Sequence, residues 1–193
     1  MTMTAPERGT IDRDEPDAGA LHRQVRLSTH RLLGATMRLG DVELLHPAAS
    51  GLGTRRHVIA RLVRHARRIT ASPGEDAAQR LASDSLLRAP AADLVDALAT
   101  SLTTVVRRLD DQPQARMPEE EGDDLCARDH LAWLELTHVD LAVGFEMHDI
   151  PEVALPAIAA HLERWRGPDA SPTGAGNSPF ALLFVEGQER RRR

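Results

Sequence analysis

The strongest constraint on the fold is a row of aliphatic residues in the middle of the chain. Over 91–110 they recur at spacings of three and four residues, so on a helix they occupy one stripe about 120° wide. The stripe consists of Leu94, Val95, Leu98, Leu102, Val105, Val106 and Leu109. Such a stripe predicts an amphipathic helix that packs against other helices.

Similar patterns predict helices over 19–39, 54–70 and 152–166, and a short one over 77–88. The segment 128–145 is apolar on nearly all sides, which is typical of a helix buried inside a bundle. The predicted fold class is therefore all-α: an antiparallel four-helix bundle with a short extra C-terminal helix. Only Phe180–Val185 resembles a strand, and a single strand cannot form a sheet.

This pattern divides the chain into three parts. Residues 1–18 carry five acids and little apolar content, which predicts a disordered tail. The bundle is expected over 19–166. A linker, the vestigial strand and an arginine-rich tail are expected over 167–193.

Composition excludes several classes of protein. All 24 basic residues are arginine, and the absence of lysine and tyrosine excludes a Schiff base and a phenolic acid or base. A lone cysteine, Cys126, cannot form an intramolecular disulfide, in keeping with a cytoplasmic protein. The net charge of −5 does not favour nucleic acid, and no apolar run reaches the roughly 20 residues of a membrane helix. The expected partner is a small-molecule ligand, and a homodimer is left open.

Histidines on two predicted helices are the best candidates for chemistry. On 54–70, His57, Arg61 and His65 are spaced four apart and rise along one side of the helix. On 128–145, His130 falls within about 60° of Trp133 and Thr137. Glu135, His138 and Asp140 are expected to point in other directions. The alternative is that these histidines are ordinary surface groups or core groups with hydrogen-bond partners.

Two stretches resemble a known family. The stretch Gly53–His65 resembles the motif G-W-T-R-x-H-V-x-A-H-x-A-x-N, and Trp133–Leu141 resembles E-V-x-x-H-x-V-D-L. Both motifs belong to the mycothiol-dependent maleylpyruvate isomerase family, a branch of the DinB-like superfamily. The resemblance covers about 20–166, and Phe180–Val185 is similar to the first strand of a second domain that many members carry. It implies a four-helix bundle in which one histidine of the first motif and a glutamate and a histidine of the second bind a divalent metal, which activates a thiol.

This chain departs from the family at all three ligand positions. Arg61, Trp133 and Thr137 stand there, and an arginine stays protonated and cannot bind a metal. We therefore expect no metal at the family position and no cofactor. Mycothiol as a cofactor is left open. A divalent metal is left open only if it binds through the displaced ligands His57, Glu135 and His138.

The same cavity then predicts a different site. Arg61, Trp133 and Thr137 would bind a substrate, and His130 and His65 would be catalytic. Because no acid was expected on that face, the partner of Arg61 would be a ligand carboxylate or enolate. The predicted function is metal-independent binding of a small anionic or conjugated metabolite, with its transformation by isomerisation, cyclisation or a similar step. The alternatives are a non-catalytic scaffold protein and a thiol transferase that uses the displaced ligands.

Overall fold

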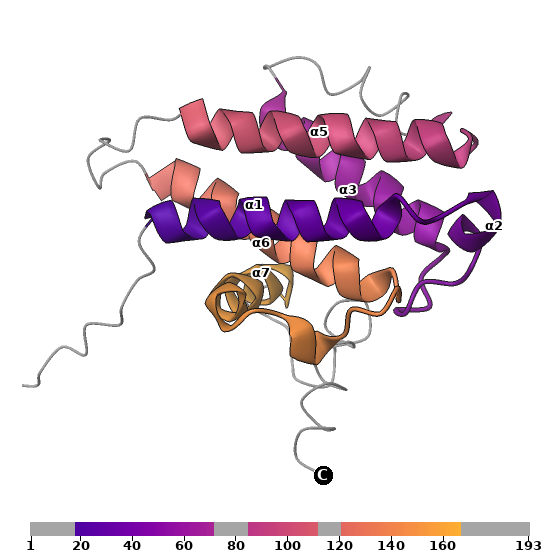
Figure 1. Cartoon of the computed structure of the whole chain (residues 1–193). Coiled ribbons are helices and arrows are strands. Elements are labelled where there is room, and N and C mark those ends of the chain that lie inside the picture. Colours follow the sequence, from indigo (N-terminus) through magenta and orange to yellow (C-terminus); the bar gives the residue numbers. More distant parts are fainter. Residues whose placement is uncertain (1–17, 72–84, 112–120, 167–193) are drawn as a thin grey trace, which may run out of the picture.

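The computed structural model describes residues 18–71, 85–111 and 121–166 (Figure 1). The described elements are all helical, which confirms the all-α class, and no strand occurs among them. They are α1 (Ala18–Thr36), α2 (Asp41–Leu44), α3 (Arg55–Thr70), α5 (Ala91–Asp111), α6 (Glu121–Asp140), η1 (Met147–Asp149), η2 (Glu152–Ala154) and α7 (Leu155–Arg166). The tail over 1–17, most of the short helix over 77–88, and the whole of 167–193 with Phe180–Val185 lie outside the described residues.

The helices differ from the prediction mainly at their ends. α6 begins at Glu121, well before the predicted residue 128, so the acidic residues Glu121, Asp123 and Asp124 belong to its first turn. Negative charge is favourable at a helix N-terminus, which makes such a start physically reasonable. α6 ends at Asp140, before the predicted residue 145, and α2 was not predicted.

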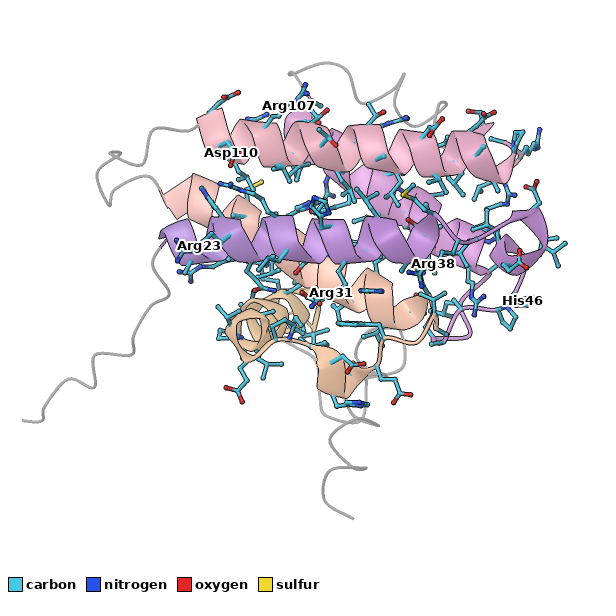
Figure 2. All side chains as sticks on the ribbon, in the orientation of Figure 1. Arg23, Arg31, Arg38, His46, Arg107 and Asp110 are labelled. Atoms are coloured by element: carbon cyan, nitrogen blue, oxygen red, sulfur yellow. The ribbon has the colours of Figure 1, made fainter. Side chains whose placement is uncertain are left out.

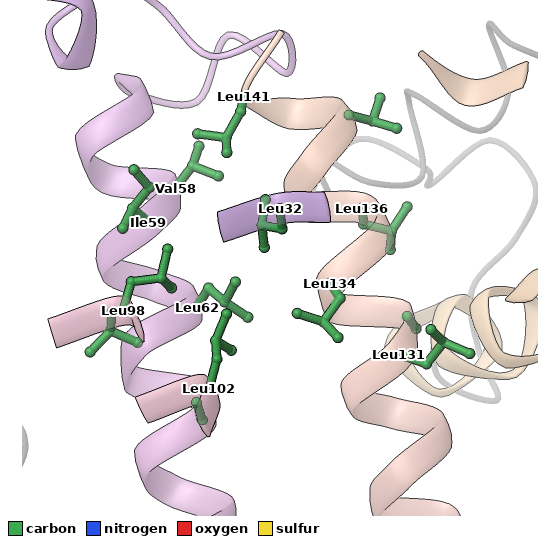
Figure 3. Close-up of a cluster of buried hydrophobic side chains, with 14 of the residues drawn as sticks. Leu32, Val58, Ile59, Leu62, Leu98, Leu102, Leu131, Leu134, Leu136 and Leu141 are labelled. Atoms are coloured by element: carbon green, nitrogen blue, oxygen red, sulfur yellow. The ribbon is translucent and has the colours of Figure 1, made fainter. Parts of the chain in front are cut away.

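The four long helices pack around a core of aliphatic side chains. α1 contacts α5 and α6, α3 contacts the same two helices, and α7 packs against α6. Figure 3 shows leucines from α1, α3, α5 and α6 meeting in this core, among them Leu32, Leu62, Leu98 and Leu134. No helix in the part of the chain that the structure describes is both long and apolar enough to cross a membrane.

Four contacts fix the direction of the helices. Arg26 in the first half of α1 pairs with Asp110 at the end of α5 at 2.8 Å, and Asp41, five residues after α1 ends, contacts the start of α5, so these two helices are antiparallel. Asp41 Oδ1 accepts hydrogen bonds from Arg56 Nη2 (3.0 Å) and from the backbone N–H of Ala91 (2.9 Å), which places the starts of α3 and α5 side by side. α3 and α5 therefore run in the same direction.

The fourth contact lies at the same end of the bundle as Asp41. Arg55, at the start of α3, donates to the carbonyl of Ala142 just after α6 (2.8 Å), so α3 and α6 are antiparallel. It follows that α1 and α6 run in one direction and α3 and α5 in the other. The expected antiparallel arrangement is thus wrong for two contacting pairs, α3 with α5 and α1 with α6.

Candidate functional site

Three of the predicted site residues meet in a stack of rings between α3 and α6. The ring of His65 stacks on Trp133 with centroids 4.8 Å apart and on His130 at 5.4 Å. His161 of α7, which sequence reasoning missed, packs edge-on against Trp133 at 5.8 Å. We call these four residues the histidine–tryptophan layer.

Two histidines of this layer, His65 and His130, are buried and uncharged at neutral pH. His65 is 3% exposed and His130 is fully buried. Burial and the neighbouring His130 lower the pKa of His65 to about 3. Burial lowers the pKa of His130 to about 4. Neither ring nitrogen of His130 has a hydrogen-bond partner among the described residues. The rings of His65 and His130 lie within 12° of parallel, so their in-plane lone pairs do not converge on one metal ion.

An acidic residue ties the layer to α7. Asp129 Oδ1 accepts hydrogen bonds from His161 Nδ1 (2.6 Å) and Arg164 Nη2 (2.7 Å). Burial alone would raise the pKa of Asp129, but the hydrogen bond and charge of His161 lower it below its usual value. The layer is therefore well connected within the protein, and its histidines and tryptophan hold α3, α6 and α7 together.

Arg61 has a partner inside the protein, which corrects the expectation that no acid shares its face. Arg61 Nη2 lies 3.1 Å from Oδ2 of Asp140, a fully buried carboxylate that also accepts the backbone N–H of Ser50 at 2.8 Å. Asp140 follows Trp133 by seven residues, close to two turns of 3.6, so the two share a helix face. The predicted direction of Asp140 was wrong for this reason. Thr137, one turn before Leu141, is buried in the same helix.

The displaced metal ligands do not come together. His57 Nδ1 contacts Thr54 Oγ1 at 2.8 Å at the start of α3, Glu135 pairs with Arg31 at 2.7 Å, and the ring of His138 stacks on another side chain, Phe145, at 4.0 Å. No group of three or more histidine, cysteine, aspartate or glutamate residues able to hold a metal occurs in 18–71, 85–111 or 121–166. The described residues therefore do not fit the metal that the family resemblance implies.

A pocket of about 640 Å³ opens on the other side of α6, between α1 and the segment 143–149. None of Arg61, His65, His130, Trp133 and Thr137 lines it. Figure 2 labels Arg23 and Arg31 along α1 and Arg38 just beyond its end, and Arg31 and Arg38 line this pocket. The charged and titratable residues that line it are His30, Arg31, Arg38, His138 and Asp149.

Arg31 is held in place by an ion pair and by an aromatic ring. Its Nη2 contacts both carboxylate oxygens of Glu135, at 2.7 and 2.9 Å, and its guanidinium lies 4.7 Å above the ring of Phe145. Ser28 donates a short hydrogen bond to the same carboxylate, and Gln24 donates to Ser28 (3.1 Å). This network fixes the position of one wall of the pocket.

The environment shifts the pKa values of two groups here. Burial raises the pKa of Glu135, although the hydrogen bond from Ser28 and the charge of Arg31 act to lower it. Burial and the charge of Arg31 lower the pKa of His138 to about 4, and Asp149 opposes this shift. His138 is therefore neutral at pH 7.

Arg38 differs from Arg31 because it has no ion-pair partner among the described residues and its side chain is exposed. The positive charge of the pocket is therefore concentrated at Arg38, while that of Arg31 is offset by Glu135. Sequence reasoning missed Arg38 because neither α1 nor the turn after it carries a recognised motif. The available signal was the absence of any acid over 18–38, next to four arginines.

Comparison with protein families, with curated proteins and with solved structures gave no match for this chain.

Proposed function

We propose that this chain binds a small anionic metabolite, whose carboxylate pairs with Arg38 in the pocket between α1 and 143–149. We further propose that its helices form a four-helix bundle of the DinB-like type, with α7 added outside α6. The observation that carries the function is the pocket, which offers an arginine with no ion-pair partner among the described residues beside an apolar wall.

The size and lining of the pocket support this proposal. A volume of about 640 Å³ falls in the range of small-molecule sites. A guanidinium can hold a carboxylate through two parallel hydrogen bonds, which makes arginine a selective anchor for such a group. Asp149 is the one acid in the lining, and His138 lies near it.

The pocket supports binding better than it supports turnover. A proton carrier for isomerisation or cyclisation would have to reach the ligand, and His130 and His65 lie in the histidine–tryptophan layer instead. His138 does line the pocket, but with a pKa of about 4 it is a weak base at pH 7. We therefore propose a ligand-binding function, with no reaction assigned to the pocket.

Calorimetry with a panel of simple carboxylates tests the proposal. We expect millimolar or tighter binding of aromatic and medium-chain aliphatic carboxylates such as cinnamate and octanoate. Arg38→Ala should weaken it by about 10- to 100-fold, the range of a hydrogen bond to a charged group. Arg23→Ala is the matched control, because Arg23 is an exposed arginine of α1 that does not line the pocket. No binding of any carboxylate, or equal binding by Arg38→Ala, would show that the proposal is wrong.

A scaffold function has one observation in its favour. Residues 18–71 contain ten arginines and two acids, Asp41 and Glu43, so α1 and α3 are strongly cationic. An acidic protein surface would complement this charge. Fluorescent poly-glutamate serves as the probe for this function. Binding that disappears at about 0.5 M salt, an ionic strength that screens surface charges, and that is weaker in Arg64→Ala would support a scaffold function. No binding at low salt would exclude it.

A further inference from the structure

The wall of the pocket on the side of α1 follows the last turns of this helix and continues past its end. His30 and Gly34 are four residues apart on α1, as are Arg31 and Ala35, whereas Arg38 and Leu39 follow in the turn after the helix ends at Thr36. From His30 to Ala35 the helix rises about 7.5 Å. The lining of the pocket therefore extends along the end of α1 and beyond it to Arg38.

The middle of this wall carries almost no side chain. A Cβ atom at Gly34 would meet no heavy atom within 4 Å, and the other central residue is Ala35. Val143, Gly144 and Phe145 line the opposite side, and Gly144 has a φ of +85° that favours glycine. The centre of the pocket is thus apolar on both sides and open enough for a chain or a flat ring.

The two ends of the pocket differ in charge. One end has Arg38, which no acid neutralises among the described residues. At the other end Glu135 offsets the charge of Arg31, and Asp149 is close enough to His138 to affect its pKa. The Nε of Arg31 is buried there without a hydrogen-bond partner among the described residues. A second carboxylate at this end would meet Asp149, whereas a hydroxyl or amide could bond to Arg31, His138 or Asp149.

We infer that the ligand lies lengthwise along α1, with a carboxylate at Arg38, an apolar body over Gly34 and Ala35, and a neutral hydrogen-bonding group near Arg31 and His138. Its chemical class is an elongated monocarboxylic acid with a polar group at the far end. This inference rests on the proposed function, because it assumes that the pocket binds a carboxylate.

Two calorimetric series test the inference with wild-type protein. In ω-hydroxycarboxylates from two to ten carbons, affinity should rise about two- to fourfold per methylene until the chain spans the pocket, since each methylene leaves water. At the best length, the dicarboxylate should bind at least about tenfold more weakly than the ω-hydroxy acid, because its second charge faces Asp149.

Variants of Gly34 test the position of the ligand body. Gly34→Leu should abolish the preference for long chains while short acids still bind through Arg38, and Gly34→Ala should retain most of that preference. Both variants should fold, because glycine is the poorer helix former and a Cβ atom at this position meets open space. Arg23→Leu is the matched control for an added leucine on the exposed side of α1, and Ala35→Leu is a second test of the same wall.

The outcomes separate this inference from the proposed function. Carboxylates that bind through Arg38 with no dependence on chain length, or with no effect of Gly34→Leu, would overturn the inference and leave the proposed function intact. Tighter binding of the dicarboxylate would also overturn it. If no carboxylate binds at all, the proposed function is wrong and the inference falls with it.

Discussion

Arg61 and Asp140 join the middle of α3 to the last residue of α6 through an ion pair of 3.1 Å. Asp140 also accepts the backbone N–H of Ser50, so one buried carboxylate connects two helices and the loop between α2 and α3. Arg61 therefore has a structural role, and we expect changes to this ion pair to alter the stability of the fold.

Replacing Asp140 by asparagine should destabilise the fold by about 2–4 kcal/mol, because it removes the charge that faces a partly buried guanidinium. The free energy of unfolding can be measured with urea. Asp96→Asn is the matched control, since Asp96 is exposed on α5 and should change stability by less than about 0.5 kcal/mol. Equal stability of both variants would show that the ion pair contributes little.

Stability should fall as the pH is lowered from about 6.5 toward 4. A histidine in the unfolded chain has a pKa of about 6.5, whereas the folded values for His65 and His130 are about 3 and about 4. In this window the unfolded state binds more protons, so the free energy of unfolding rises with pH. Glu135, whose pKa is raised, acts in the opposite direction and reduces the slope.

A variant isolates the contribution of His130 to this slope. His130→Phe should make the pH dependence between 6 and 4.5 shallower by about 1 kcal/mol per pH unit, the effect of one proton. His46→Gln is the control, because His46 is exposed and should leave the slope unchanged. Urea unfolding at several pH values measures both, and an unchanged slope in His130→Phe would contradict the assignment.

Removing the charge of Glu135 should strengthen binding of carboxylates. In Glu135→Gln the charge of Arg31 is no longer offset, so the affinity for octanoate should rise about three- to tenfold at low salt and less at high salt. Glu163→Gln, on the exposed side of α7, should leave the affinity as it is. Weaker binding by Glu135→Gln would mean that Arg31 needs this partner to keep the pocket formed.

His57 should stabilise the start of α3, and this stabilisation should not depend on a bound metal. Its Nδ1 accepts the backbone N–H of Thr54 at 3.3 Å, as a glutamine would in a capping box. His57→Ala should cost about 0.5–1 kcal/mol, and His57→Gln should cost less. Thermal unfolding with and without a chelator tests this; a chelator effect that disappears in His57→Ala would favour the displaced metal ligands instead.

The sequence predicted those features that a local pattern determines. The stripe over Leu94–Leu109 predicted α5, and the apolar character of 128–145 predicted that α6 would be buried. Helical spacing also placed His130 and Trp133 on one face, where His65 meets them. The direction of α5 could not be predicted, because it depends on Asp41 and Arg56, contacts between residues far apart in the chain.

The pocket was missed for a similar reason. Arg38 lies in the turn after α1 and Phe145 in an irregular segment after α6, and no spacing within either stretch relates the two. Asp140 is a different case, because its spacing of seven residues from Trp133 is close to two helical turns and already places the two on one face of α6, toward Arg61.

The shared direction of α3 and α5 sets a minimum length for the connection between them. α3 has 16 residues and is about 24 Å long, and the chain must return over this distance before α5 can begin beside the start of α3. An extended chain covers about 3.3–3.6 Å per residue, so about seven or eight residues are the shortest possible link. Residues 71–90 exceed this length, which leaves room for deletions or for an inserted domain, whereas a two-residue turn in their place would force a different topology.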